Sequence, residues 1–183
     1  MRLIADDITR QLIDDEIRSA RYPEHDPARW ALPLLDMLAP PGASWTLVEL
    51  DANEYGGLWL PAHRGEACHG DAMSLGGDDR GGTVATRAAW LDGHAETYAA
   101  ANPSCWSRLE RARVAGPTAI VIARHSVGDR VKPDEAALVV VDGLHRALAG
   151  WRRGDRSCRA YLASPSATTA PAVSRTTTIG GND

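Results

Sequence analysis

Ala137-Leu-Val-Val-Val-Asp-Gly-Leu-His-Arg146 decides the fold, and it runs on into Ala147-Leu-Ala-Gly-Trp-Arg-Arg-Gly154. The apolar run Leu138–Val141 is rich in β-branched residues, which predicts a buried strand. After Asp142-Gly143, apolar residues recur at helical spacing until Gly154, a residue typical of helix C termini. The sequence therefore predicts a strand, an acidic glycine turn and a helix in direct succession.

A helix that begins at such a turn is suited to binding an anion. Its first backbone N–H groups have no partner within the helix, and they carry the positive end of the helix dipole. Arg146 adds a planar fork of donors, and His145 adds a group that titrates near neutral pH. The same residues also suit an ordinary strand-to-helix turn with a solvated Arg146 and a packed His145.

Length, charge and composition exclude several classes of protein. A chain of 183 residues fits one domain with its own core, and a net charge of −4 argues against a nucleic-acid-coating surface. Lys132 is the only lysine, and its context excludes a Walker A phosphate loop. Cys68, Cys105 and Cys158 are an odd number at wide spacing, so neither a disulfide framework nor a zinc ribbon is expected.

The chain shows no sign of a membrane segment. Its first residues lack an apolar stretch of signal-peptide length, and no apolar run is long enough to span a bilayer. We expect a cytoplasmic protein with one domain over residues 1–163. Residues 164–183 are rich in Ser, Thr, Ala, Pro and Gly, which predicts a disordered tail.

Residues 1–42 are predicted to form a helical extension. An apolar stripe at helical spacing predicts a first helix that packs on the core or on a second subunit of a homodimer. The stripe consists of Ile4, Ile8, Leu12, Ile13 and Ile17. Asp26-Pro27 has the form of a helix start, and the second helix that it predicts ends before Pro40.

The rest of the chain predicts an α/β (α+β) fold, a small mixed sheet flanked by helices. Apolar and β-branched runs predict strands, and apolar residues at helical spacing predict helices. The expected strands are 45–50, 118–123, 138–141 and 157–162, and the expected helices beside 144–153 are 84–101 and 104–114. Asp51–Tyr55 is expected to be a polar turn.

Residues 56–82 form a Gly-rich insertion, which is unusually long for a structureless loop in a compact domain. It contains His63, Cys68, His69 and Asp71, whose spacing matches no familiar metal-ligand pattern. A functional lid, a metal site and a plain polar loop are the three interpretations of this segment.

The order of these segments resembles the ParB/sulfiredoxin superfamily over about residues 45–163. The resemblance lies in Thr118–Ile122, in Val139–Ala149 with its Asp-Gly-x-His-Arg sequence, and in Arg159–Leu162. It implies a small α/β fold that binds nucleotide phosphates at this turn. Leu144 stands where sulfiredoxin has its cysteine, so sulfinic-acid repair is not expected. Only a polar tail follows Leu162, which with the acidic charge makes a DNA-partition role unlikely.

Within the superfamily, the chain is most similar to the free serine kinases, which carry Asp-Gly-His-His-Arg. Those kinases also have a strand that ends in Glu-Leu-Asp and is closely followed by a catalytic Glu. Here Glu49-Leu-Asp51 is followed by Glu54. The resemblance implies that Glu54 accepts the proton of the substrate hydroxyl, with Glu49 as the competing residue.

The resemblance also implies roles for the turn. Asp142 would orient the hydroxyl or a metal ion, and His145 would help to balance the charge that develops during the reaction. His145, Arg146 and the backbone N–H groups of Gly143 and Leu144 would hold the phosphates. ATP or ADP is the expected phosphoryl donor, with Mg²⁺, and the acceptor is a serine-like amino acid or related small hydroxylated metabolite.

Two other functions fit the same motif. A nucleotide-binding regulator would use the turn without turnover. A protein associated with DNA modification could also carry Asp-Gly-x-His-Arg, although the net charge of −4 argues against nucleic acid as a partner.

Overall fold

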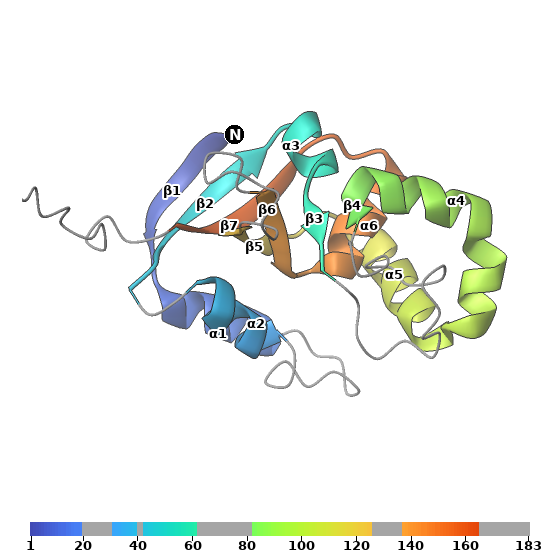
Figure 1. Ribbon diagram of the computed structural model, residues 1–183, viewed down its shortest axis with the longest axis horizontal. Helices are drawn as coiled ribbons and strands as arrows, with labels where there is room; N and C mark the ends of the chain where they lie inside the picture. The colour runs from blue at the N-terminus through green and yellow to red at the C-terminus, as the bar shows by residue number, and fades with distance from the viewer. Residues whose placement is uncertain (20–30, 40–41, 62–81, 126–136, 165–183) are drawn as a thin grey trace, which may run out of the picture.

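The computed structural model describes residues 1–19, 31–39, 42–61, 82–125 and 137–164 (Figure 1). Within these ranges six helices and seven strands form a mixed α/β fold, as the sequence predicts. The strands are β1 (Arg2–Ile8), β2 (Ser44–Leu50), β3 (Trp59–Leu60), β4 (Gly82–Thr83), β5 (Ile120–His125), β6 (Ala137–Asp142) and β7 (Cys158–Ser164). The helices are α1 (Arg10–Ser19), α2 (Ala31–Leu38), α3 (Ala52–Gly56), α4 (Val84–Ala101), α5 (Pro103–Ala115) and α6 (Leu144–Arg153).

All described strands belong to one sheet in the order β1-β2-β7-β5-β6-β3-β4. Strand β7 is antiparallel to β2 and parallel to β5, and β5 is antiparallel to β6. The C-terminal ends of β2 and β6 therefore lie at the same edge of the sheet as the starts of β5 and β7. The Asp142-Gly143 turn follows β6 at this edge.

Helices cover both faces of the sheet. Figure 1 shows α1 and α2 together on one side and α4, α5 and α6 together on the other. Along β5, Ile120 and Ile122 belong to the core under α4–α6, whereas Val121 and Ala123 belong to the core under α1 and α2. Alternate residues of a strand point to opposite faces, so a central strand that is buried on both sides is apolar throughout.

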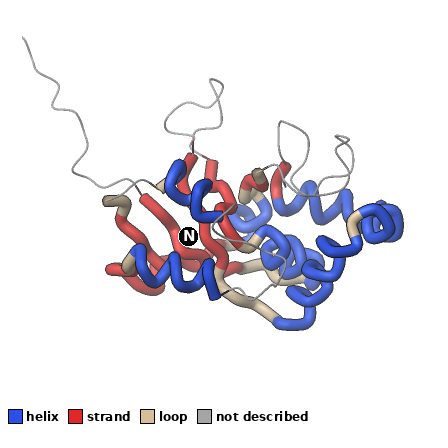
Figure 2. The backbone as a smooth tube through the Cα atoms, turned by 90° about the horizontal axis from the view of Figure 1, so that it is seen from below, coloured by secondary structure: helices blue, strands red, loops and turns tan. Residues whose placement is uncertain are grey.

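Helices α4 and α5 extend the molecule beyond the sheet. Figure 2 shows them gathered at one end, away from the strands. Thr83 caps α4 by accepting a hydrogen bond from the Thr86 N–H, and Asn102-Pro103 separates the two helices. Both helices lie where the sequence predicts them. None of the described helices has the length and apolar character needed to cross a membrane.

The N-terminal extension differs from the prediction. Residues 2–8 form strand β1 at the edge of the sheet, and the helix starts only at Arg10. Ile4 and Ile8 suit either structure, and the strand is favoured because it gives partners to the outer backbone groups of β2, which a helix at 2–8 would leave unpaired. Ile13 and Ile17 are fully buried against the sheet, so α1 packs on the core of its own chain.

The predicted polar turn at 51–55 is instead the short helix α3. The Asp51 carboxylate accepts hydrogen bonds from the N–H groups of Asn53 and Glu54, and the Glu54 carboxylate accepts one from the Asp51 N–H. This reciprocal arrangement is a capping box, and its Asp-x-x-Glu spacing is visible in the sequence. The turn prediction is wrong because Asp51 and Asn53, residue types that favour turns, here cap and begin a helix.

Parts of the other predictions fall outside the described residues. The first and last residues of the Gly-rich insertion belong to described structure, with β3 and β4 paired antiparallel. His63, Cys68, His69 and Asp71 lie outside the description, as do the Asp26-Pro27 helix start and residues 165–183. Ser164, predicted to begin the tail, is the last residue of β7 and pairs with Ser44.

Candidate functional site

The turn between β6 and α6 has a backbone that requires glycine. Gly143 adopts the left-handed conformation with φ 94° and ψ 23°, and it is the residue that precedes the first turn of α6. A Cβ atom at this position would lie 2.7 Å from Cγ2 of Ile120. Because glycine has no side chain, the N-cap residue of α6 leaves the first N–H groups of the helix uncapped. Such groups are suited to an anionic ligand.

The Arg146 guanidinium crosses the edge of the sheet from one helix layer to the other. Its Nη2 donates to Asp142 Oδ2 at 2.6 Å, and its Nη1 donates to the carbonyl oxygen of Ala119 at 2.7 Å. Nη1 also lies 3.9 Å from Oε1 of Glu16 on α1. The side chains of Arg146 and Asp142 are 22% and 13% exposed, so both are accessible from solvent at this edge.

These contacts show which groups of the turn are available to a ligand. Asp142 is paired with Arg146, which holds the guanidinium beside the start of α6. A guanidinium has five N–H donors, and the two short bonds leave others to face a ligand. Leu144 and His145 are partly buried on the first turn of the same helix. The structure thus brings together the four predicted phosphate-binding residues and Asp142 in one turn.

Glu54 is held by different partners. Its Oε2 accepts the Asp51 N–H at 3.1 Å and lies 2.7 Å from the Met1 amine. The hydrogen bond to Glu54 raises the pKa of the Met1 amino group. Glu49, the competing carboxylate, forms an ion pair with Arg2.

The sheet order separates the two strands that lead into Glu54 and into the turn. Strands β7 and β5 lie between β2, which leads into Glu54, and β6, which leads into Asp142. Three strand spacings correspond to about 14 Å. Glu54 is engaged by the α3 cap and the Met1 amine, and its pairing with the turn as a catalytic unit stays a prediction.

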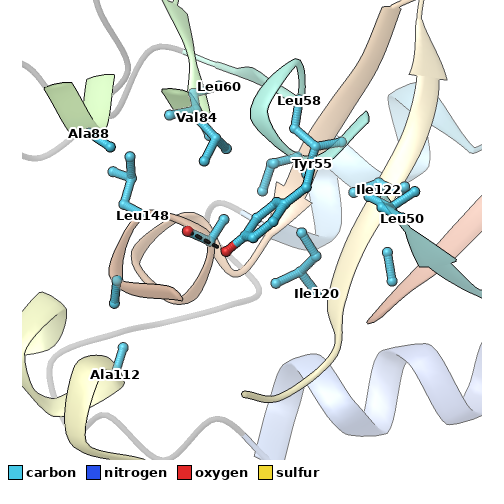
Figure 3. Close-up of a cluster of buried hydrophobic side chains, with 14 of the residues drawn as sticks. Leu50, Tyr55, Leu58, Leu60, Val84, Ala88, Ala112, Ile120, Ile122 and Leu148 are labelled. Carbon is cyan, nitrogen blue, oxygen red and sulfur yellow. Dashed lines mark hydrogen bonds between the residues drawn. The ribbon is translucent and has the colours of Figure 1, made fainter. Parts of the chain in front are cut away.

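Tyr55, on α3, ties that helix to the helix of the turn. Its hydroxyl donates to the Ala147 carbonyl at 2.6 Å, and its ring meets Trp151 edge-on with centroids 5.3 Å apart. Figure 3 shows Tyr55 among buried apolar side chains that include Leu58, Ile120 and Leu148. Burial raises the pKa of the phenol, so it stays protonated. In the sequence, the only signal that places Tyr55 on a helix is the Asp-x-x-Glu spacing of the capping box.

Cys158 lies at the same edge of the sheet, paired with Leu50 in the β2–β7 ladder. Burial raises the pKa of its thiol to about 12, although Arg146 opposes the shift. At neutral pH the thiol is protonated and therefore a poor nucleophile.

Among the described residues, no group of three or more His, Cys, Asp or Glu side chains could hold a metal ion. Asp142 is committed to Arg146, so its carboxylate does not fit a metal held by the protein alone. Mg²⁺ commonly binds through one or two carboxylates together with the phosphates of a nucleotide. The residues of the turn fit a phosphate group better than a bare metal ion.

A protein-family model described as a family of unknown function, DUF6309, matches residues 26–179. The chain belongs to the DUF6309 family. The match includes Glu54 and the whole turn at 142–146, whereas β1 and α1 lie outside it. No curated protein and no solved structure matches the chain. The ParB/sulfiredoxin resemblance therefore stays a prediction from the sequence.

Proposed function

We propose that this DUF6309 protein is a nucleotide-dependent phosphotransferase whose phosphate site is the turn at 142–146. The phosphoryl donor is ATP or ADP, and the acceptor is the hydroxyl group of a serine-like amino acid or a related small metabolite. The cytoplasm supplies both substrates. The observation that carries the proposal is the left-handed Gly143 at the start of α6 with the Arg146 fork beside it.

Each part of the turn supports phosphate binding. The N–H groups of Leu144 and His145 lie at the positive end of the α6 dipole, where a phosphate is stabilised. Arg146 is fixed within the same turn by Asp142 and by the Ala119 carbonyl. A guanidinium held in place in this way loses little freedom when it binds a phosphate.

The transfer step then needs one proton acceptor. The substrate oxygen forms a bond to the terminal phosphorus, and the bond from that phosphorus to the bridging oxygen breaks, so the shortened nucleotide leaves with the electron pair. The hydroxyl proton passes to a carboxylate. Either carboxylate would first have to leave a partner, since Asp142 is bonded to Arg146 and Glu54 is held by the α3 cap and the Met1 amine. Asp142 is the first candidate because it belongs to the turn.

Mg²⁺ enters this proposal as the counter-ion of the nucleotide. It would neutralise charge on the phosphates. The chain's own residues bind the phosphates, orient the acceptor and take the proton.

A non-catalytic nucleotide-binding regulator is the second candidate. The observation that favours it is the engagement of Glu54 and Glu49, the two carboxylates that the kinase resemblance would use. In this case the turn binds the nucleotide, and the consequence is a change in stability or partner binding without turnover.

Calorimetry and ³¹P NMR separate the two candidates. The full chain is titrated with ATP and with ADP, and is then incubated with each nucleotide, Mg²⁺ and a panel of free hydroxy amino acids. We expect binding and a new phosphate-ester resonance. Binding without product identifies the regulator, and no binding of either nucleotide refutes both candidates.

Two variants assign the proton acceptor. Asp142→Asn is expected to lower turnover by about 100-fold or more, the range typical of a general base. Glu54→Gln, the matched amide variant on α3, is expected to keep the wild-type rate within about two-fold. The reverse pattern would assign the proton transfer to Glu54 and would require α3 to rearrange.

A further inference from the structure

We infer that Glu16 competes with bound phosphate for Arg146 and thereby sets the anion affinity of the α6 turn. This inference rests on the proposed phosphate site. Glu16 was not among the residues predicted from the sequence. It comes from α1, which lies on the opposite face of the sheet from α6.

The three contacts of Arg146 differ in length. The bonds to Asp142 and to the Ala119 carbonyl are 2.6 and 2.7 Å, whereas the nearest Glu16 oxygen is 3.9 Å from Nη1. Of the two charged partners of Arg146, Glu16 has the more exposed side chain, at 40% against 13% for Asp142. The contact to Glu16 is therefore the one that an incoming anion can replace most easily.

Charge gives the direction of the effect. Asp142 and Glu16 both place a negative charge beside the positive charge of Arg146. A phosphate beside Arg146 would meet the Glu16 carboxylate at close range. Binding thus requires either that Glu16 moves away or that repulsion is accepted, and each lowers the affinity.

The fold keeps Glu16 close to Arg146. Ile13 and Ile17, on the same helix, are fully buried in the core under α1 and α2, so α1 cannot shift freely. On its outer side Glu16 lines a shallow open depression together with Thr9, Leu12 and Asp15. Its side chain therefore has open space to move into when a phosphate takes its place.

Glu16 lies outside the part of the chain that the family model matches. The matched residues 26–179 contain the turn, whereas Glu16 and the rest of α1 precede them. The phosphate site and the residue that modulates it are thus distinct in sequence and adjacent in space.

The test is the affinity for ATP, measured by calorimetry at low ionic strength, of the wild-type chain, Glu16→Gln and Asp15→Asn. Asp15 is the matched control, because it is the adjacent carboxylate on α1, lines the same depression and bonds Gln11. We expect Glu16→Gln to tighten ATP binding by about two- to five-fold, the factor that an exposed ion pair contributes. Asp15→Asn should change it by less than about 1.5-fold, because its charge is screened by solvent.

A second measurement excludes a merely structural effect of Glu16. In an Arg146→Met background, Glu16→Gln should alter ATP affinity less than it does in the wild-type chain, because the competition for the guanidinium is absent and only the repulsion between the two anions is left. Should that variant fail to fold, the comparison of Glu16→Gln with Asp15→Asn decides alone. Equal effects of those two variants, or weaker binding by Glu16→Gln, would overturn the inference while leaving the phosphate site intact. Absence of ATP binding in the wild type and in Glu16→Gln would overturn the proposed function itself.

Discussion

Gly143 and Gly154 lie at the two ends of α6, and both adopt left-handed backbone conformations, with φ of 94° and 101°. They differ in what surrounds them. A side chain at Gly143 would collide with Ile120, whereas a side chain at Gly154 would meet open space. Substitution at both positions carries the cost of a left-handed backbone, but only a side chain at Gly143 would also disturb the turn. Comparing the two variants therefore separates these effects.

Gly143→Ala is expected to lower the free energy of unfolding by at least about 2 kcal/mol, since it adds a clash to the cost of a left-handed alanine. Gly154→Ala is expected to cost about 1 kcal/mol. Urea unfolding measures both values. Gly143→Ala should also lose ATP binding at 10 °C while Gly154→Ala keeps it, and equal ATP affinities would contradict the site.

The Tyr55 hydroxyl makes a buried hydrogen bond that fixes α6 from below the turn. Tyr55→Phe removes this bond and keeps the ring contact with Trp151. We expect a loss of about 1 kcal/mol in the free energy of unfolding, measured in urea. An unchanged stability would show that the bond contributes nothing to the position of α6.

Some features of the candidate site can be predicted from the sequence, and others depend on how distant segments pack. The grouping of Gly143, His145 and Arg146 followed from their adjacency in one motif. The approach of Glu16 to Arg146 did not, because it depends on how α1 packs across the sheet. The catalytic role of Glu54 is implied only by the resemblance to the free serine kinases, whereas its capping role follows from the Asp-x-x-Glu spacing.

At the scale of elements, the apolar patterns predicted most of the fold. The helix predicted at 84–101 has those bounds. The strands predicted at 45–50, 118–123, 138–141 and 157–162 correspond to β2, β5, β6 and β7, with ends that differ by one or two residues. These segments have one dominant period, so the local pattern and the tertiary environment agree. Residues 2–8 are the exception, because Ile4 and Ile8 fit two periods and a neighbouring strand decides between them.

The α3 cap gives a prediction for an element. Asp51→Ala removes the acceptor for two N–H groups of α3, and the expected loss is about 1 kcal/mol in the free energy of unfolding. Asn53→Ala, an exposed position on the same helix, should cost less than about 0.5 kcal/mol. Thermal melting compares the two variants, and equal losses would rule out the Asp51 cap as a stabilising contact.

At the scale of the whole molecule, buried acids at the edge of the sheet predict a loss of stability at alkaline pH. Burial raises the pKa of the Cys158 thiol to about 12, and it also raises the pKa of the Tyr55 phenol. Below about pH 8 both groups are protonated in the folded and the unfolded chain, and the stability is unaffected. Above that pH the unfolded chain loses these protons first, so stability falls as the pH rises.

Urea unfolding between pH 7 and 10.5 measures this effect. The free energy of unfolding should fall above about pH 8, by at most about 1.4 kcal/mol per pH unit for each group. Cys158→Ala should flatten the decline. A stability that stays constant to pH 10.5, or a decline that the variant leaves unchanged, would be inconsistent with a buried thiol at this position.

The turn at 142–146 joins these scales, because one left-handed glycine, one helix start and a contact between two layers meet there. The most direct test is a ¹H–¹⁵N NMR titration of the full chain with ADP. We predict that the largest amide shifts occur at Gly143, Leu144, His145 and Arg146. An absence of shifts, or shifts centred on α4 and α5 at the far end of the molecule, would contradict the phosphate site.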